Sequence, residues 1–278
     1  MEQRPIFVND LLYKLDKKLI ELLRGLSVAD WSKQTIAPKW KVKDVAVHLL
    51  DGNIRALSML RDKHFTEVTD PLDSYKALVT YLNRLNADWI KAMQRVSPKV
   101  LVELLELTGK EFCEFMKTLN PFDKAVFSVA WAGEEESKNW FHVAREYTEK
   151  WHHQQQIRLA IGDSAELLKN EFYVPYLETS MRALPHHYRT IKGKEGDSIK
   201  IVVLNNGENA WLLKRNADKW ELQQESLGNP SCEVRIPGEI AWRIFTKGIS
   251  KKEALEQSEI VGKQQLGGRI FELVAVMA

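Results

Sequence analysis

The sequence predicts a mostly α-helical domain over residues 1–185, followed by a smaller α+β domain over residues 190–278. Up to about residue 185, apolar residues recur at three- and four-residue spacings, which is the pattern of helices with one buried face. Near Ile199 the pattern changes to alternation, which is typical of β-strands. The length of 278 residues and the composition, 44% hydrophobic and 28% charged, fit two ordinary globular domains.

Turn and capping signals divide the first domain into helices. Asp70 and Pro71 are a typical cap and first-turn proline, so a helix should begin there. Gly162 marks a helix end, whereas Pro175 should kink or restart the helix that contains it. We expect residues 121–138 to form a loop with room for a short strand pair. The expected helices cover residues 6–25, 41–62, 71–96, 98–120, 140–162 and 165–183.

Short alternating runs and one clear turn define the second domain. The sequence Asn205-Asn206-Gly207 separates two apolar runs and indicates a hairpin. Helical spacing returns after the last run. We expect strands over residues 199–204, 210–214, 219–222 and 232–237, and helices over residues 238–247 and 263–276.

Composition excludes several functional classes. The net charge of +2 comes from interspersed Lys, Arg, Asp and Glu, and no basic run is long enough to follow a phosphate backbone, so nucleic acid is not an expected partner. The N-terminus lacks an apolar signal segment and no run of 18 apolar residues occurs, which predicts a cytoplasmic protein. Cys113 and Cys232 are the two cysteines. They lie in different expected domains and form no C-x-x-C pair, so neither a disulfide framework nor a cysteine-rich zinc site is indicated.

The helix expected over residues 140–162 carries the strongest signal for chemistry. Glu149 and His153 are four residues apart, so they share a face and can bind one divalent metal. The best third ligand is His48, at the edge of the apolar face of an earlier helix. His152 is the neighbour of His153, and the pattern leaves open which imidazole binds.

Two segments carry a family resemblance. The sequences WKVKDVAVHL at residues 40–49 and EKWHHQQQIRLAIG at residues 149–162 resemble the metal-ligand segments of the mycothiol-dependent maleylpyruvate isomerase family. That family belongs to the DinB-like, or bacillithiol-transferase-like, superfamily of four-helix bundles. The segment IAWRIFTKG at residues 240–248 and the tail at residues 261–278 are similar to the family's C-terminal α+β domain. The resemblance implies a divalent metal, usually zinc, held by His48, Glu149 and His153.

A three-ligand site and this resemblance together suggest the reaction. Three protein ligands leave one position on zinc open, and a thiol bound there loses its proton readily. The resemblance implies mycothiol or bacillithiol as that thiol. We therefore expect a metal-dependent thiol S-transferase or thiol-dependent isomerase that acts on a small electrophile, as a monomer or homodimer. Arg243 is a candidate contact for an anionic substrate. The alternative is a non-catalytic, metal-containing protein that binds a small ligand or a partner.

Overall fold

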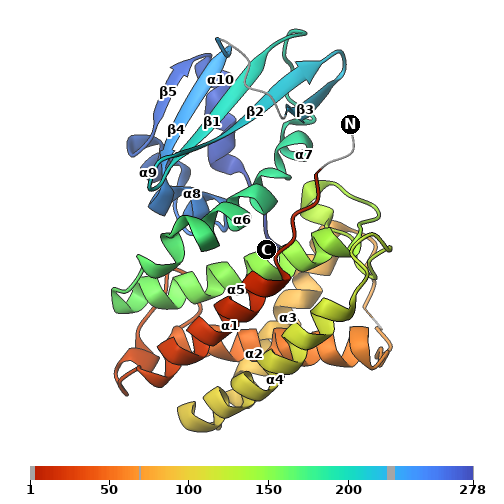
Figure 1. Ribbon diagram of the computed structural model, residues 1–278, viewed down its shortest axis with the longest axis vertical. Helices are drawn as coiled ribbons and strands as arrows, with labels where there is room; N and C mark the ends of the chain where they lie inside the picture. Colours follow the sequence, from red (N-terminus) through yellow and green to blue (C-terminus); the bar gives the residue numbers. More distant parts are fainter. Residues whose placement is uncertain (1–3, 69, 224–228, 278) are drawn as a thin grey trace. The chain divides into compact units, whose positions relative to one another are not determined.

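The computed structural model describes residues 4–68, 70–223 and 229–277. It divides into two compact units (Figure 1). The first unit consists of Met1–Val126, Lys138–Ser164 and Met277–Ala278, and the second consists of Phe127–Ser137 and Ala165–Val276.

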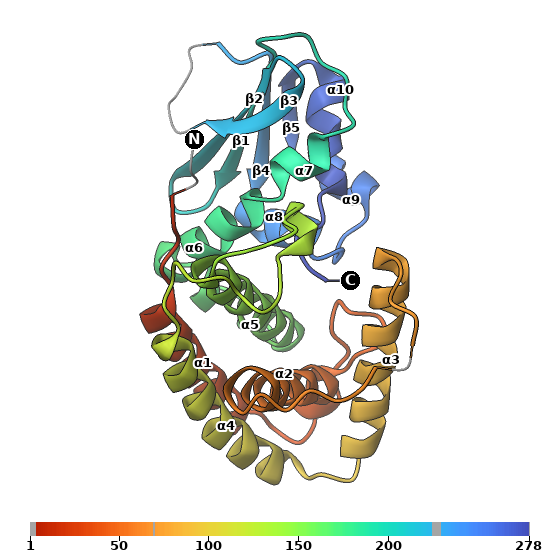
Figure 2. The ribbon, with the colours of Figure 1, turned by 90° about the vertical axis from the view of Figure 1, so that its right-hand side faces the viewer.

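In the described residues, the first unit is built from five α-helices. α1 packs against α4 and α5, and α2 packs against α3, α4 and α5 (Figure 2). The apolar side chains between these helices form its core. The helices are α1 (Asn9–Arg24), α2 (Val42–Ala56), α3 (Tyr75–Met93), α4 (Pro98–Thr118) and α5 (Asn139–Ile161), and a π-helical turn, Leu57–Arg61, extends α2.

Local sequence signals account for most of these helix limits. In α4, the side chain of Ser97 accepts a hydrogen bond from the backbone N–H of Val100, and Pro98 takes the first helical position. Gly162 ends α5 with a left-handed φ of +84°, a conformation that glycine adopts without strain. The helix α5 thus has the limits that the sequence predicts to within about one residue.

The start of α3 differs from the prediction. The helix begins at Tyr75, because the side chain of Ser74 accepts a hydrogen bond from the backbone N–H of Ala77. Asp70 instead pairs with Arg84. Met93 is the one buried residue that α3 contributes in the described part of the chain. This helix therefore lies at the edge of the first unit, where it packs against α2.

A five-stranded sheet forms the centre of the second unit, with the strand order β3-β2-β1-β4-β5. β1 is antiparallel to β2 and parallel to β4. Asn206 and Gly207 both have positive φ, as the hairpin signal predicts. The strands are β1 (Ser198–Leu204), β2 (Glu208–Asn216), β3 (Lys219–Gln223), β4 (Cys232–Pro237) and β5 (Glu259–Gly262).

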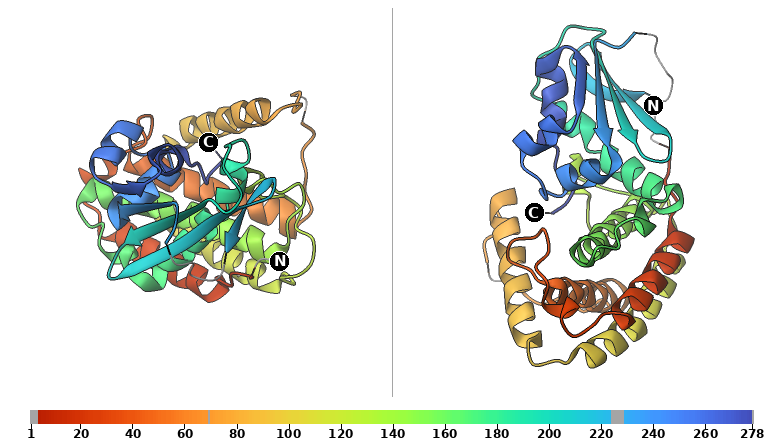
Figure 3. Two further views of the ribbon diagram at one scale, coloured as in Figure 1. Left: turned by 90° about the horizontal axis from the view of Figure 1, so that it is seen from above. Right: turned by 90° about the vertical axis from the view of Figure 1, so that its left-hand side faces the viewer.

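Short helices accompany this sheet. α7 packs against β3, α8 against β1 and β4, and α10 against β4 and β5. Figure 3 shows the C-terminal helices, in blue, along one face of the sheet. The helices are α6 (Asn170–Met181), α7 (Leu184–Tyr188), α8 (Gly238–Phe245), α9 (Lys251–Glu256) and α10 (Gln264–Gly267).

The prediction of one helix over residues 263–276 is wrong. The segment contains the short α10 and a 3₁₀ turn over Gly268–Glu272, and no helix follows in the described residues. The adjacent glycines 267 and 268 weaken a continuous helix. Gly267 is also a packing requirement, because a Cβ there would lie 2.7 Å from the Sγ of Cys232.

The boundary between the units lies near residue 165, whereas the sequence suggested 185–190. α6 packs as part of the second unit, where the hydroxyl of Tyr173 donates to the backbone oxygen of Gly238 at 2.5 Å. The loop at 127–137 also belongs to this unit, since its 3₁₀ turn Ala130–Ala132 contacts α7. Helical periodicity continues through residue 185, so the change to alternation does not coincide with the change of unit.

Among the described residues, no helix has both the length and the apolar character that crossing a bilayer requires.

Candidate metal centre

The structure brings together three residues that the sequence predicts as metal ligands. His48 comes from α2, and Glu149 and His153 come from α5. One donor atom from each lies within 4.8 Å of the other two. The Nε2 of His153 lies 3.4 Å from a carboxylate oxygen of Glu149. Donors that bind one zinc ion are at most about 4.2 Å apart, so small side-chain adjustments would complete the fit.

A hydrogen bond fixes the ring of His153. Its Nδ1 lies 2.9 Å from the Oε1 of Gln156, one turn further along α5. An imidazole that donates from Nδ1 keeps a free lone pair on Nε2, which is the nitrogen nearest to Glu149. Metal-bound histidines usually have such a partner on the second ring nitrogen. The sequence places Gln156 on the same stripe of the helix but gives no reason to assign it this role.

His48 is held by ring contacts. Its ring lies 4.7 Å from that of Trp40 and 4.6 Å from that of His153, measured between centroids. The Nδ1 of His48 is buried, and the part of the chain that the structure describes offers it no hydrogen-bond partner. A buried, unpaired polar atom costs roughly 1–3 kcal/mol, and a bound cation would relieve this cost if Nδ1 is the ligand.

The protonation states of His48 and Glu149 at pH 7 are those that suit cation binding. Burial, together with the neighbouring His153, lowers the pKa of His48 well below 6.5, so this imidazole is neutral at pH 7. Burial alone would raise the pKa of Glu149, but the close approach of the His153 ring and the surrounding imidazoles outweigh it and keep that pKa below its ordinary value. A neutral imidazole and an ionised carboxylate are the forms that ligate zinc.

His152 lies beside these donors but faces differently. Its ring centroid is 3.9 Å from that of His153, and its Nδ1 lies 2.9 Å from the backbone oxygen of Thr148. Burial lowers its pKa to about 3. The group of mutually close donor atoms contains His153 and not His152. The geometry thus favours His153 where the sequence left both open.

Arg243, the candidate substrate contact, belongs to α8 of the second unit. Its guanidinium lies 5.8 Å from the ring centroid of Trp242. Its role as a substrate contact at the metal centre stays a prediction.

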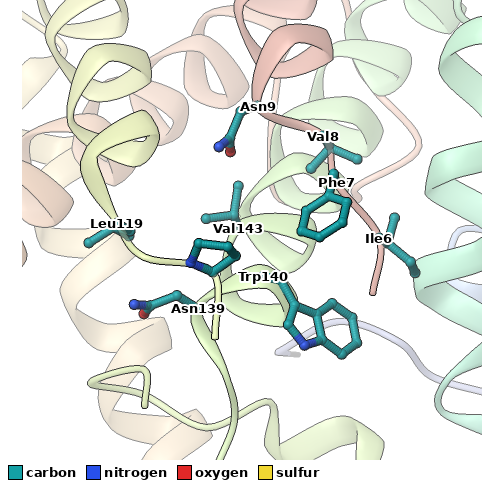
Figure 4. A pocket seen from close by; sticks show the side chains of 9 residues that line it. Ile6, Phe7, Val8, Asn9, Leu119, Asn139, Trp140 and Val143 are labelled. Atoms are coloured by element: carbon teal, nitrogen blue, oxygen red, sulfur yellow. The ribbon is translucent and has the colours of Figure 1, made fainter. Parts of the chain in front are cut away.

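A hollow elsewhere in the first unit is too small for an organic ligand. It lies between the start of α1, the end of α4 and the start of α5 (Figure 4). Its volume of about 10 Å³ is at the lower limit for one water molecule. None of its lining residues belongs to the triad of His48, Glu149 and His153.

Replacement of Gln156 by leucine should weaken zinc binding by about 10- to 100-fold, because the ring of His153 loses the partner that orients it. A competition titration with a zinc chelator measures the effect. Gln155→Leu is the matched control, since Gln155 donates instead to the backbone oxygen of Ser164. If the two variants bind zinc with equal affinity, Gln156 does not orient His153 for metal binding.

Because His142 is buried, we expect the free energy of unfolding to decrease in acid. Burial, followed by the nearby Arg145, lowers its pKa from 6.5 to about 4, while Glu146 opposes the shift. Below about pH 6.5 the unfolded chain gains a proton that the folded chain does not accept until about pH 4, so stability is complete above pH 6.5 and falls across this range. His142→Asn should reduce this loss by up to about 3 kcal/mol. Denaturant unfolding at pH 7.5 and 4.5 tests this, and an unchanged acid loss in the variant would contradict it.

One protein family and two solved structures are similar to this chain. The family described as "Mycothiol maleylpyruvate isomerase N-terminal domain" matches residues 12–158, just over half of the chain. Two solved structures are similar, the mycothiol-dependent maleylpyruvate isomerase and a histidine-to-alanine mutant of it. Each is 12% identical in sequence, covers 85% of this chain and 88% of its own, and has a TM-score of 0.48. No curated protein matches the chain significantly.

Proposed function

Because this chain belongs to the family of the mycothiol maleylpyruvate isomerase N-terminal domain, we propose that it is a metal-dependent enzyme that uses a low-molecular-weight thiol. The thiol would be transferred to a small electrophile or would assist its isomerisation. One observation carries the proposal. His48 of α2 lies close to Glu149 and His153 of α5, and one donor atom from each lies within 4.8 Å of the other two. Mycothiol or a similar thiol is the cosubstrate that the family name suggests.

The donor set fits zinc. Two imidazole nitrogens and one carboxylate oxygen are a ligand set of catalytic zinc sites, which keep one position open. When bound, such a cation would lower the pKa of a thiol in that position. The carboxylate of Glu149 would reduce the net charge of the cation and its three protein ligands from +2 to +1. Gln156 would keep the ring of His153 in the orientation that binds.

Once the thiolate has formed, the isomerisation requires mainly that it be held close to the double bond of the substrate. A thiolate that adds to a conjugated cis double bond turns it into a single bond, and rotation followed by loss of the thiolate gives the trans product. No proton or electron is lost overall, so the thiol is regenerated. In a transfer by addition, the carbanion that forms when the thiolate adds instead takes up the proton that the thiol released, and the thioether is the product. Trp40 lies against both His48 and His153 and would shield one side of the site from water.

The arrangement of helices supports a more specific fold assignment. We interpret α1, α2, α4 and α5 as the four helices of a DinB-like bundle, because each contacts at least two of the others. The second unit, with its five-stranded sheet, would correspond to the family's C-terminal α+β domain.

Thiol binding to the metal-loaded protein tests the proposal. We expect the cobalt-substituted protein to develop a thiolate-to-metal absorption band when mycothiol or bacillithiol is added, with saturation at one thiol per metal. The protein with His48 replaced by alanine serves as the control. A protein that binds the metal but gives no such band with either thiol would favour the alternative, a non-catalytic metal-containing binder.

A further inference from the structure

The first unit contains a buried polar cluster that the proposed chemistry does not use. Lys150 of α5 is 6% exposed, and Asp16 of α1 is 8% exposed. The Nζ of Lys150 donates to the Oδ1 of Asn53 at 2.5 Å and lies 3.5 Å from the Oδ1 of Asp16. Asn53 belongs to α2 and is fully buried.

The cluster continues into α4. The Nδ2 of Asn53 donates to the hydroxyl of Thr108 at 3.2 Å, and that hydroxyl donates to the backbone oxygen of Leu104 at 2.7 Å. We call Asp16, Asn53, Thr108 and Lys150 the lysine network. It takes one polar side chain from each of α1, α2, α4 and α5.

The packing around the network leaves little freedom. A Cβ added to Gly109 would lie 2.4 Å from a carboxylate oxygen of Asp16, so α1 and α4 approach closely only because residue 109 has no side chain. The ammonium of Lys150 also lies 4.5 Å from the centroid of the Phe112 ring. The network is therefore enclosed on the side of α4 as well.

The network and the metal ligands lie on the same two helices. Lys150 follows Glu149 directly in α5, and Asn53 comes five residues after His48 in α2. We propose that the lysine network sets the rotation and axial register of α5 against α2, and so makes its members positioning residues for the metal ligands. This inference rests on the proposed function, since it assumes that the three donors bind a metal.

Apolar packing alone does not define that register well. Ten of the seventeen buried residues of α5 are polar or charged, and among the described residues Ile157 is the one buried α5 side chain in the apolar cluster that this helix shares with α2. The apolar stripe of α5, formed by Trp140, Ala144, Tyr147 and Trp151, lies on another side of the helix and does not fix its rotation against α2. A rotation of about 10° displaces the end of a side chain about 5–6 Å from the helix axis by about 1 Å. Metal–ligand bond lengths stay within about 0.2 Å of their standard values, so a displacement of this size exceeds what the bonds themselves accommodate. A specific polar contact between the helices is a known means of fixing register.

The energetics of buried ion pairs suggest a variant that changes the placement of the metal ligands without a large change in the stability of the fold. Removal of one partner leaves a buried charge unpaired and destabilises strongly, whereas replacement of the whole group by apolar residues of similar volume is often neutral. The decisive variant is therefore the triple replacement Asp16→Leu, Asn53→Leu and Lys150→Met. Thr179→Val with Ser180→Ala is the control, because these buried hydroxyls donate to backbone oxygens within α6, in the second unit.

The experiment measures the absorption spectrum of the cobalt-substituted protein, the zinc affinity by chelator competition, and the melting temperature without metal. We expect the triple variant to melt close to the wild type, to bind zinc at least about tenfold more weakly, and to show an altered cobalt spectrum. The control should change neither affinity nor spectrum. A triple variant with wild-type affinity and spectrum would overturn the inference.

Two further outcomes remain interpretable. If the wild-type protein itself binds neither metal, the proposed metal centre fails, and the network inference fails with it for that separate reason. If the triple variant does not fold, Thr108→Val decides, since it removes the acceptor of Asn53. Thr179→Val is its matched control, because both threonines donate to the backbone oxygen four residues earlier. A larger loss of zinc affinity in Thr108→Val supports the inference, and an equal one overturns it.

Discussion

Replacing His153 with alanine should abolish stoichiometric zinc binding and lower the melting temperature of the zinc-loaded protein. A metal that binds the folded state alone stabilises it by about 4 kcal/mol when free zinc is about 1,000 times its Kd. For a domain of this size that corresponds to roughly 10 °C. The variant should therefore melt about 10 °C below the wild type with zinc present. Elemental analysis and thermal unfolding, each with and without a chelator, measure the two effects.

The neighbouring imidazole provides the control for this experiment. His152→Ala removes a histidine from the same helix, but the Nδ1 of His152 lies against the backbone oxygen of Thr148 and outside the close donor group. It should keep one zinc ion per chain. If His152→Ala loses the metal and His153→Ala retains it, the ligand assignment is reversed.

Replacing His48 with alanine should reduce the thiol-dependent turnover of a model electrophile by about 1,000-fold. Stabilisation of a thiolate by a cation contributes several kcal/mol, and each 1.36 kcal/mol corresponds to a factor of ten in rate. The assay compares initial rates for metal-loaded proteins with mycothiol, bacillithiol and glutathione. His64→Ala is the matched control, because His64 is an exposed histidine of the same unit.

The outcome of this assay distinguishes the two functional readings. A rate for His48→Ala equal to that of the wild type, with every thiol, would contradict catalysis at this site. If the wild type binds zinc at full stoichiometry in the same preparation, the metal then has a structural role and the binder reading is favoured.

The candidate ligands were accessible from the sequence because their signal is local. Glu149 and His153 are one helical turn apart, and a helix free of proline places them on one face whatever the tertiary structure. The choice between His152 and His153 was not accessible in this way. Adjacent residues on a helix differ by about 100° in direction, so the rotation of α5 against α2 decides which one faces His48.

The lysine network shows why other features could not be predicted. Asp16 and Asn53 are 134 and 97 residues from Lys150, and nothing in the composition of their own helices marks them as partners. The C-terminal segment illustrates the same limit. Its apolar spacing suggested a helix, but Gly267 is required by close packing against Cys232 of β4, a contact that local pattern does not reveal.

The most direct test of the account is the location of zinc in crystals of the metal-loaded protein by anomalous diffraction at the zinc edge. We expect one peak per chain, about 2.0–2.2 Å from one nitrogen of His48, a carboxylate oxygen of Glu149 and Nε2 of His153, with a non-protein ligand in the fourth position. A peak bound by His152 in place of His153, a peak elsewhere on the chain, or no peak at stoichiometric zinc would contradict the proposed metal centre.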